Sequence, residues 1–248
     1  MGGSARYRYG KKIANAMNAG ESEERIAELQ RQMQEAIARE KARKAERLAL
    51  QTIDTTDRMI SGAGINPVSG RTLSEASRLR DATPKRFHDT LAKTKSKQHP
   101  EDAWRVDVHS IKDYIKDNDK LFLTEGGSAI AVTPDGDIIS VCRNVDDEAS
   151  GSDILARAVE MGGVKLDSYA GNHSFYTKNG FEPVSWVKWD DRYAPPGWKE
   201  DRDKREPIIF YRYVGHKVTE TAEEFMARVK PSKRYSRGMN VRDKKINS

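Results

Sequence analysis

Residues 172–181 have the sequence Asn-His-Ser-Phe-Tyr-Thr-Lys-Asn-Gly-Phe, which predicts a short helix stopped by an Asn-Gly pair. Phe181 then begins a run of strand-forming residues that extends to Trp189. Upstream, the sequence predicts a helix at 153–161, which two glycines end, and a strand at 164–169. Helices and strands therefore alternate around residues 172–181.

A β-hairpin is predicted before these elements. Residues 128–133 and 137–143 are strand-like, and the Pro-Asp-Gly-Asp turn at residues 134–137 fixes their register. Residues 121–123 and 207–214 are further predicted strands. The fold class that we expect is α/β of the α+β kind, with a mixed, mainly antiparallel sheet flanked by helices.

The N-terminal part is predicted to be helical and charged. Residues 1–20 form a basic arm with interleaved tyrosines, a composition that suits nucleic acid. Residues 21–57 contain no Gly or Pro and are rich in helix formers. Apolar residues follow a heptad pattern from Ile26 to Ala36, and charged residues then interrupt it. This long helix is predicted either to be mostly exposed or to form a coiled coil with a protein partner or its own copy.

Composition divides the chain into four segments. Residues 1–60 are the basic arm and the long charged helix, and residues 61–100 are a Gly/Pro hinge and a basic linker, with helices on either side of Pro84. Residues 101–215 have globular composition and form the predicted domain. Residues 216–248 are a short helix and a basic C-terminal tail.

The net charge of +6 conceals a segregation of charge along the chain. Residues 100–227 carry 16 basic and 25 acidic residues, whereas residues 228–248 carry eight basic and one acidic. Residues 71–99 are basic too. We expect these basic flanks either to bind nucleic acid or another anionic partner, or to be solvated without a ligand.

Cys142 is the single cysteine, which excludes a disulfide framework and a cysteine-based zinc cluster. It falls in a strand pattern and is predicted to be buried rather than a nucleophile. No stretch approaches the roughly 18 apolar residues that would span a bilayer, and no signal peptide is recognisable. The expectation is a cytoplasmic protein with no membrane partner and no metal.

The region between the strand at 137–143 and the helix at 153–161 has the layout of an anion site. Unpaired amide groups of a turn and of a helix N-terminus can bind a phosphate. The alternative is a tight strand-to-helix turn without a ligand.

The order of these elements, together with a Tyr-x-Lys-x-Gly-Phe pattern at Tyr176, Lys178, Gly180 and Phe181, resembles the GNAT-type N-acetyltransferase superfamily. The resemblance covers about residues 102–214. It implies a GNAT-like fold and the transfer of an acetyl group from acetyl-coenzyme A to an amine of an unidentified acceptor.

By this resemblance, Tyr176 is the general acid that protonates the departing thiolate of coenzyme A. General acid catalysis of this kind is worth about 10²- to 10⁴-fold. The alternative for Tyr176 is an aromatic core residue. The resemblance also implies that the cofactor contacts the backbone from Val141 to Arg143. Amides at the start of the helix, those of Gly151, Ser152 and Asp153, would bind its pyrophosphate. Two later side chains, Asn172 and Lys178, would contact it as well.

The general base has no fixed motif position in this family. Glu125, near a strand edge, is the first candidate. Asp107 is the second, and His109 and His173 follow.

The sequence departs from the family pattern at three positions. Glu148 stands where the family has Gln or Arg, Asp153 stands where it has Gly or Ala, and Tyr169 replaces a common Asn. Acidic groups repel a pyrophosphate at a distance of several ångströms. The alternative function is therefore a non-catalytic protein of the same fold, which resembles accessory or virion proteins of bacteriophages and binds nucleic acid or a protein through its basic flanks. Its location would be the host cytoplasm or the virion.

Overall fold

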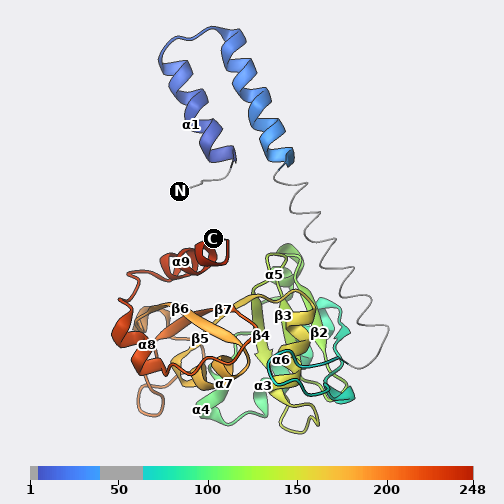
Figure 1. Ribbon diagram of the computed structural model, residues 1–248. Coiled ribbons are helices and arrows are strands. Elements are labelled where there is room, and N and C mark those ends of the chain that lie inside the picture. The colour runs from blue at the N-terminus through green and yellow to red at the C-terminus, as the bar shows by residue number, and fades with distance from the viewer. Residues whose placement is uncertain (1–4, 40–63, 248) are drawn as a thin grey trace. The chain divides into compact units, whose positions relative to one another are not determined.

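The computed structural model describes residues 5–39 and 64–247, and the chain divides into two compact units, residues 1–60 and 61–248 (Figure 1). In the first unit, helix α1 (Ala5–Asn18) is followed by a second helical segment at residues 23–39. The predicted basic arm is therefore helical. The rest of the predicted helix at 21–57 lies outside the described residues, and the coiled coil stays a prediction.

Two antiparallel sheets form the second unit (Figure 1). The first sheet has the strand order β1-β2-β3-β4 and the second has the order β5-β7-β6. The strands are β1 (Arg80–Asp81), β2 (Lys120–Leu123), β3 (Ala129–Val132), β4 (Ile138–Cys142), β5 (Lys165–Tyr169), β6 (Phe181–Val187) and β7 (Ile208–Tyr213). A mixed α/β class with antiparallel sheets flanked by helices is thereby confirmed, with two sheets in place of the one expected.

Helices and short 3-10 turns connect the strands. They are η1 (Glu75–Ser77), α3 (Pro84–Ser96), α4 (Pro100–Ala103), α5 (Ile111–Lys116), α6 (Gly151–Glu160), η2 (Ala170–Asn172), α7 (His173–Lys178), η3 (Asp191–Tyr193), α8 (Ala222–Arg228) and α9 (Tyr235–Ile246). Ser or Thr caps fix the start of several helices, because each side-chain oxygen accepts a hydrogen bond from an otherwise unpaired amide. These caps are Thr83, Ser110, Ser150 and Thr221.

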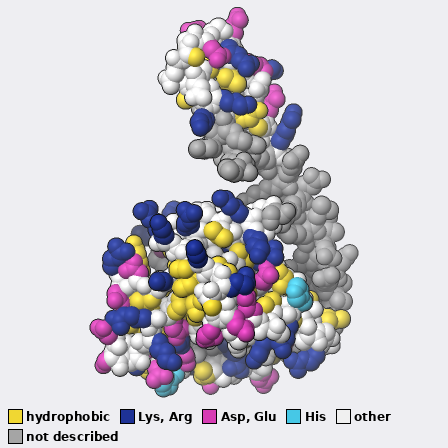
Figure 2. Space-filling view, turned by 60° about the vertical axis from the view of Figure 1, so that its left-hand side comes forward, with side chains coloured by type: hydrophobic (Ala, Val, Ile, Leu, Met, Phe, Trp, Pro, Cys, Tyr) yellow, Lys and Arg dark blue, Asp and Glu magenta, His cyan; other side chains and the backbone are white. Residues whose placement is uncertain are grey.

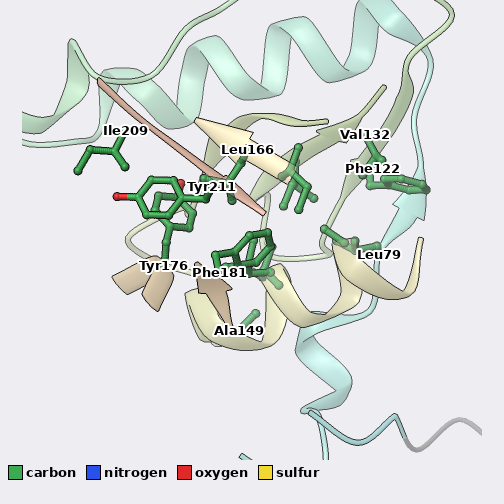
Figure 3. Close-up of a cluster of buried hydrophobic side chains, with 14 of the residues drawn as sticks. Leu79, Phe122, Val132, Ala149, Leu166, Tyr176, Phe181, Ile209 and Tyr211 are labelled. Atoms are coloured by element: carbon green, nitrogen blue, oxygen red, sulfur yellow. The ribbon is translucent and has the colours of Figure 1, made fainter. Parts of the chain in front are cut away.

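Two hydrophobic clusters pack against the strands. The larger cluster combines α6, α7 and α8 with both sheets, and includes Ile154, Tyr176, Phe181 and Tyr211 (Figure 3). The smaller cluster joins α3 and α5 to strands of the first sheet through Phe87, Leu91 and Tyr114, among others. The first sheet is therefore covered by helices on both faces.

Helix α3 corrects the predicted domain boundary. Phe87 and Leu91 are fully buried, so residues 84–96 belong to the core of the unit rather than to a linker. The helix predicted before Pro84 is wrong, because that segment forms η1 and then β1, which pairs with β2. The residue before a proline disfavours the helical conformation, which agrees with this outcome. The compact unit thus extends well beyond the predicted 101–215.

Strands β4 and β5 diverge. A parallel bridge between Asp137 and Lys165 joins them. Among the described residues, β4 otherwise pairs with β3 alone, and β5 pairs with β7 alone. Ser140 has a φ of 53°, which is unusual for a residue with a side chain, and the β3–β4 register shifts nearby. The edges of β4 and β5 that turn toward each other therefore lack strand partners.

Helix α9 corrects the prediction of a basic C-terminal tail, because it packs on the second sheet. Arg242 is fully buried and donates to Asp137 Oδ2 at 2.6 Å and Oδ1 at 3.2 Å. A Cβ atom on Gly238 would lie 2.3 Å from Cε2 of Phe210, so the close approach of α9 requires glycine there. A buried charge pair and a glycine contact thus fix the helix in place.

Replacing Arg242 by Ala should destabilise this unit by about 3–5 kcal/mol, because it leaves Asp137 buried without its counter-charge. The free energy of unfolding in urea is the measurement. Arg228→Ala is the matched control, since Arg228 pairs with Glu220 on the surface and exposed ion pairs contribute little. Equal losses in the two variants would contradict the importance of the buried pair.

Candidate functional site

Tyr176 of α7 lies in the larger hydrophobic cluster and is only 7% exposed. Its ring centroid is 5.2 Å from that of Phe175, 6.2 Å from that of Phe181 and 5.6 Å from that of Tyr211. Figure 3 shows Tyr176 beside Tyr211. Burial raises the pKa of Tyr176 to about 12, and an opposing contact with the Ser168 hydroxyl is smaller. The phenol is therefore protonated at neutral pH and can act as a proton donor.

The residues around Tyr176 hold α7 in place. The ring nitrogens of His173 are hydrogen-bonded to Tyr211 Oη at 3.1 Å and to the Glu220 carbonyl at 2.8 Å. After the helix, Gly180 has a φ of 86° and a Cβ atom there would lie 2.8 Å from Val68 Cγ2. Both nitrogens of His173 are occupied, so this candidate base has a structural role.

The acidic loop after β4 buries one of its carboxylates and pairs another with a lysine on the surface. Asp147 is 4% exposed and accepts hydrogen bonds from Thr124 Oγ1, from Ser128 Oγ at 2.5 Å and from the Ala149 amide at 2.9 Å. Asp146 pairs with Lys97 at 2.6 Å. The loop is therefore less repulsive to an anion than its composition suggests, although Glu148 is exposed.

The N-terminus of α6 follows this loop. Ser150 caps the helix by accepting a hydrogen bond from the Asp153 amide at 3.1 Å. The prediction that this amide is free to bind the cofactor is therefore wrong. The amides of Gly151 and Ser152 precede it in the first turn, where a helix offers no carbonyl partners. They remain able to bind an anion, which the helix dipole favours.

Arg143 and Phe175 both lie beside Gly151. A Cβ atom on Gly151 would be 3.3 Å from Phe175 Cζ and 4.0 Å from Arg143 Cδ. The Arg143 guanidinium donates to the carbonyls of Ala149 at 2.7 Å and Asp147 at 2.5 Å, which fixes it beside the loop. Phe175 of α7 thus packs against the start of α6, and its ring centroid lies 5.2 Å from that of Tyr176.

The remaining predicted cofactor residues differ in their surroundings. Asn172 donates from Nδ2 to Ser168 Oγ at 3.0 Å and thus joins the surroundings of Tyr176. Val141 is half-buried on β4, the strand with an open edge. Lys178 is exposed at the end of α7, and the carbonyl of Arg143 already accepts a hydrogen bond from Gln98 at 2.8 Å.

Three of the predicted bases lie elsewhere. Glu125 occupies the β2–β3 turn, where its side chain is 78% exposed and pairs with Arg80 at 2.9 Å. Asp107 and His109 pair with each other at 3.3 Å, and this hydrogen bond raises the pKa of the imidazole. Neither Glu125 nor this pair contacts Tyr176.

Asp167 is the group that sequence reasoning missed. It precedes Ser168 on β5, and since strand side chains alternate, it lies on the face opposite to Ser168 and Tyr176. Tyr235 of α9 donates to its carboxylate at 2.9 Å. Burial, and then the charge of Asp137, raise the pKa of Asp167 to about 6. The available signal was a carboxylate in a predicted strand, directly after the core residue Leu166.

No family model matches the chain, and neither a curated protein nor a solved structure is similar to it. Among the described residues, no helix is long and apolar enough to cross a membrane. Within the same part of the chain, no group of three or more His, Cys, Asp or Glu residues could hold a metal ion. The site must therefore be interpreted from its own geometry.

Asp147→Asn should destabilise the protein by about 1–3 kcal/mol at pH 7, because the amide cannot accept all the hydrogen bonds of the carboxylate. Burial alone would raise the pKa of Asp147, but the hydrogen bonds from Ser128, Thr124 and the Ala149 amide outweigh it and lower the pKa. The stability that this carboxylate contributes is therefore present above pH 4 or so and is lost as the pH falls further.

Chemical unfolding between pH 2.5 and pH 7 measures this effect. The difference in unfolding free energy between wild type and Asp147→Asn should shrink on acidification. Asp146→Asn, at a more exposed ion pair, is the control and should change little. A difference that does not vary with pH would rule out the assigned role.

Proposed function

We propose that this protein transfers an acetyl group from acetyl-coenzyme A to an amine, on a GNAT-type fold. The observation that carries the proposal is that Phe175, which packs on Tyr176, lies against Gly151 at the start of α6, while β4 and β5 have open edges. The Tyr-x-Lys-x-Gly-Phe pattern gives independent support from the sequence. The predicted cytoplasmic location belongs to the same proposal.

The residues present fit acetyl-coenzyme A, which would supply an activated thioester. The amides of Gly151 and Ser152 would bind the pyrophosphate, and Arg143 lies beside them with a positive charge. The unpaired edge of β4 at Val141 would pair with the amide groups of the pantetheine arm. The inward turn of Asp147 and the ion pair of Asp146 reduce the charge repulsion that the loop composition implies.

Tyr176 would carry the proton transfer to the leaving group. The acceptor amine would react as its free base: its nitrogen would bond to the acetyl carbon and release its extra proton to solvent, the carbon–sulfur bond would break, and Tyr176 would donate its proton to the departing sulfur. The pKa of Tyr176 suits this role, since burial raises it to about 12 and the phenol keeps its proton. Asp167 lies on the opposite face of β5, beneath α9, and does not reach the same reacting atoms.

The second candidate function is a non-catalytic binding protein with the same fold. Exposed Glu148, immediately before the α6 N-terminus, favours it because its charge opposes a pyrophosphate. Calorimetric titration with acetyl-coenzyme A separates the two functions. Saturable binding that weakens in Arg143→Ala supports the transferase, whereas no binding at millimolar cofactor supports the alternative.

Tyr176→Phe should lower the transfer rate by about 10²- to 10⁴-fold while leaving cofactor affinity within about twofold, because it removes only the proton donor. Release of free thiol from acetyl-coenzyme A, with spermidine and a lysine peptide as trial acceptors, is the assay. Tyr193→Phe is the control, since Tyr193 is 79% exposed in the β6–β7 connection. An unchanged rate in Tyr176→Phe would remove Tyr176 from the mechanism.

The pH dependence of kcat/KM should show no falling limb up to pH 10, since Tyr176 must keep its proton to act as an acid and burial raises its pKa to about 12. The thiol-release assay across this range is the measurement. Asp167→Asn is the control and should leave the profile unchanged, because Asp167 faces α9 on the other side of β5. A falling limb below pH 10 that disappears in Tyr176→Phe would contradict the protonated state assigned to Tyr176.

A further inference from the structure

The outward side of the C-terminal segment carries a row of cations, which we call the α9 basic face. Its members are exposed and belong to α9 or to the ten residues before it; they are Lys230, Lys233, Arg234, Arg237 and Lys244. Figure 2 shows Lys and Arg side chains gathered along the upper edge of the unit formed by residues 61–248, where Figure 1 places α9. This surface is a local concentration of positive charge.

The cations of the α9 basic face differ from most arginines of the same unit in lacking counter-charges. Arg105, Arg202, Arg205 and Arg212 each pair with a carboxylate at 2.5 to 2.8 Å. None of the five cations of the α9 basic face forms an ion pair with any residue that the structure describes. Their charge is therefore uncompensated.

The few acidic groups beside α9 are already engaged. Asp243 is bound by Arg242 at 3.0 Å and by Lys165 at 3.2 Å. Asp167 accepts the hydrogen bond from Tyr235, and Glu182 pairs with Arg212 at 2.7 Å. These carboxylates do not offset the cations of the α9 basic face, so an external anion would meet a net positive field.

The fold holds this charge row in a fixed position. Gly238 and Arg242 face inward on α9, against Phe210 and Asp137. Arg237 and Lys244 are seven residues apart, so they lie on one side of the helix about 10 Å from each other along its axis. Because the helix is anchored by its other face, binding there would order side chains but not backbone.

We infer that the α9 basic face binds the phosphate backbone of a nucleic acid, an interaction that does not depend on the proposed acetyl transfer. Ser236 and Asn240 are exposed among the cations and can donate hydrogen bonds to phosphate oxygens. Lipid insertion is disfavoured, because Val241 is the exposed aliphatic side chain of α9, and a membrane-surface helix needs a broad apolar face. The side chains would contact phosphates rather than bases, so the affinity is independent of base sequence.

The test is fluorescence anisotropy of a labelled 20-base-pair duplex of arbitrary sequence with the full chain, over a range of salt concentrations and without acetyl-coenzyme A. The variant replaces Lys233, Arg234, Arg237 and Lys244 by Gln. Its affinity should fall by at least about tenfold, and the slope of log K against log salt should decrease in magnitude by about 3 to 4. A second duplex of different sequence should bind equally well.

The control replaces four exposed lysines on other elements by Gln and has the same net charge; these are Lys112, Lys116, Lys199 and Lys204. It should retain most of the affinity and the wild-type slope. Absence of binding by the wild type, or equal losses in the two variants, would overturn the inference. So would tighter binding, at equal charge concentration, to vesicles of phosphatidylserine and phosphatidylcholine or to polyglutamate. The thiol-release assay is unaffected by any of these outcomes.

Discussion

The buried ion pair between Asp137 and Arg242 is the contact on which the compact unit depends. Asp137 lies at the turn where β4 begins, and its bridge to Lys165 is the point at which the two sheets meet. Beyond this point the strands separate and leave the edges that the proposed cofactor site requires. On the other side of the pair, Arg242 fixes α9 and with it the α9 basic face. One charge pair thus supports both proposed sites, at the desolvation cost that any buried pair carries.

Local signals made much of the fold predictable from sequence. The turn at residues 134–137, the glycines after α6 and the Asn-Gly pair after α7 mark element ends by backbone chemistry that acts over a few residues. Strand β1 escaped prediction because it is two residues long and exists through pairing with β2, about 40 residues later. The packing of α3 and the burial of Arg242 also depend on distant partners, which composition does not reveal.

In the candidate site, too, some residues could be predicted from the sequence and others could not. Tyr176, Gly151 and Ser152 could be assigned from a motif and from helix geometry. The inward turn of Asp147 could not, since its partners Thr124 and Ser128 come from another hairpin. The raised pKa of Asp167 was missed because its environment is created by α9 and by Asp137. The exposed position of Glu125 beside Arg80 depends on the pairing of β1 with β2. Residues whose properties arise from tertiary contacts are the ones that sequence patterns miss.

The separation of Asp137 and Arg242 by 105 residues has a consequence for biosynthesis. At a synthesis rate of about 5–20 residues per second, Asp137 precedes its partner by roughly 5 to 20 s. During that interval the first sheet can form with a carboxylate that has no counter-ion and therefore stays hydrated. The ion pair can thus form only after α9 has been synthesised, so the edge of the first sheet at Asp137 stays open to water while the second sheet and α9 are being made.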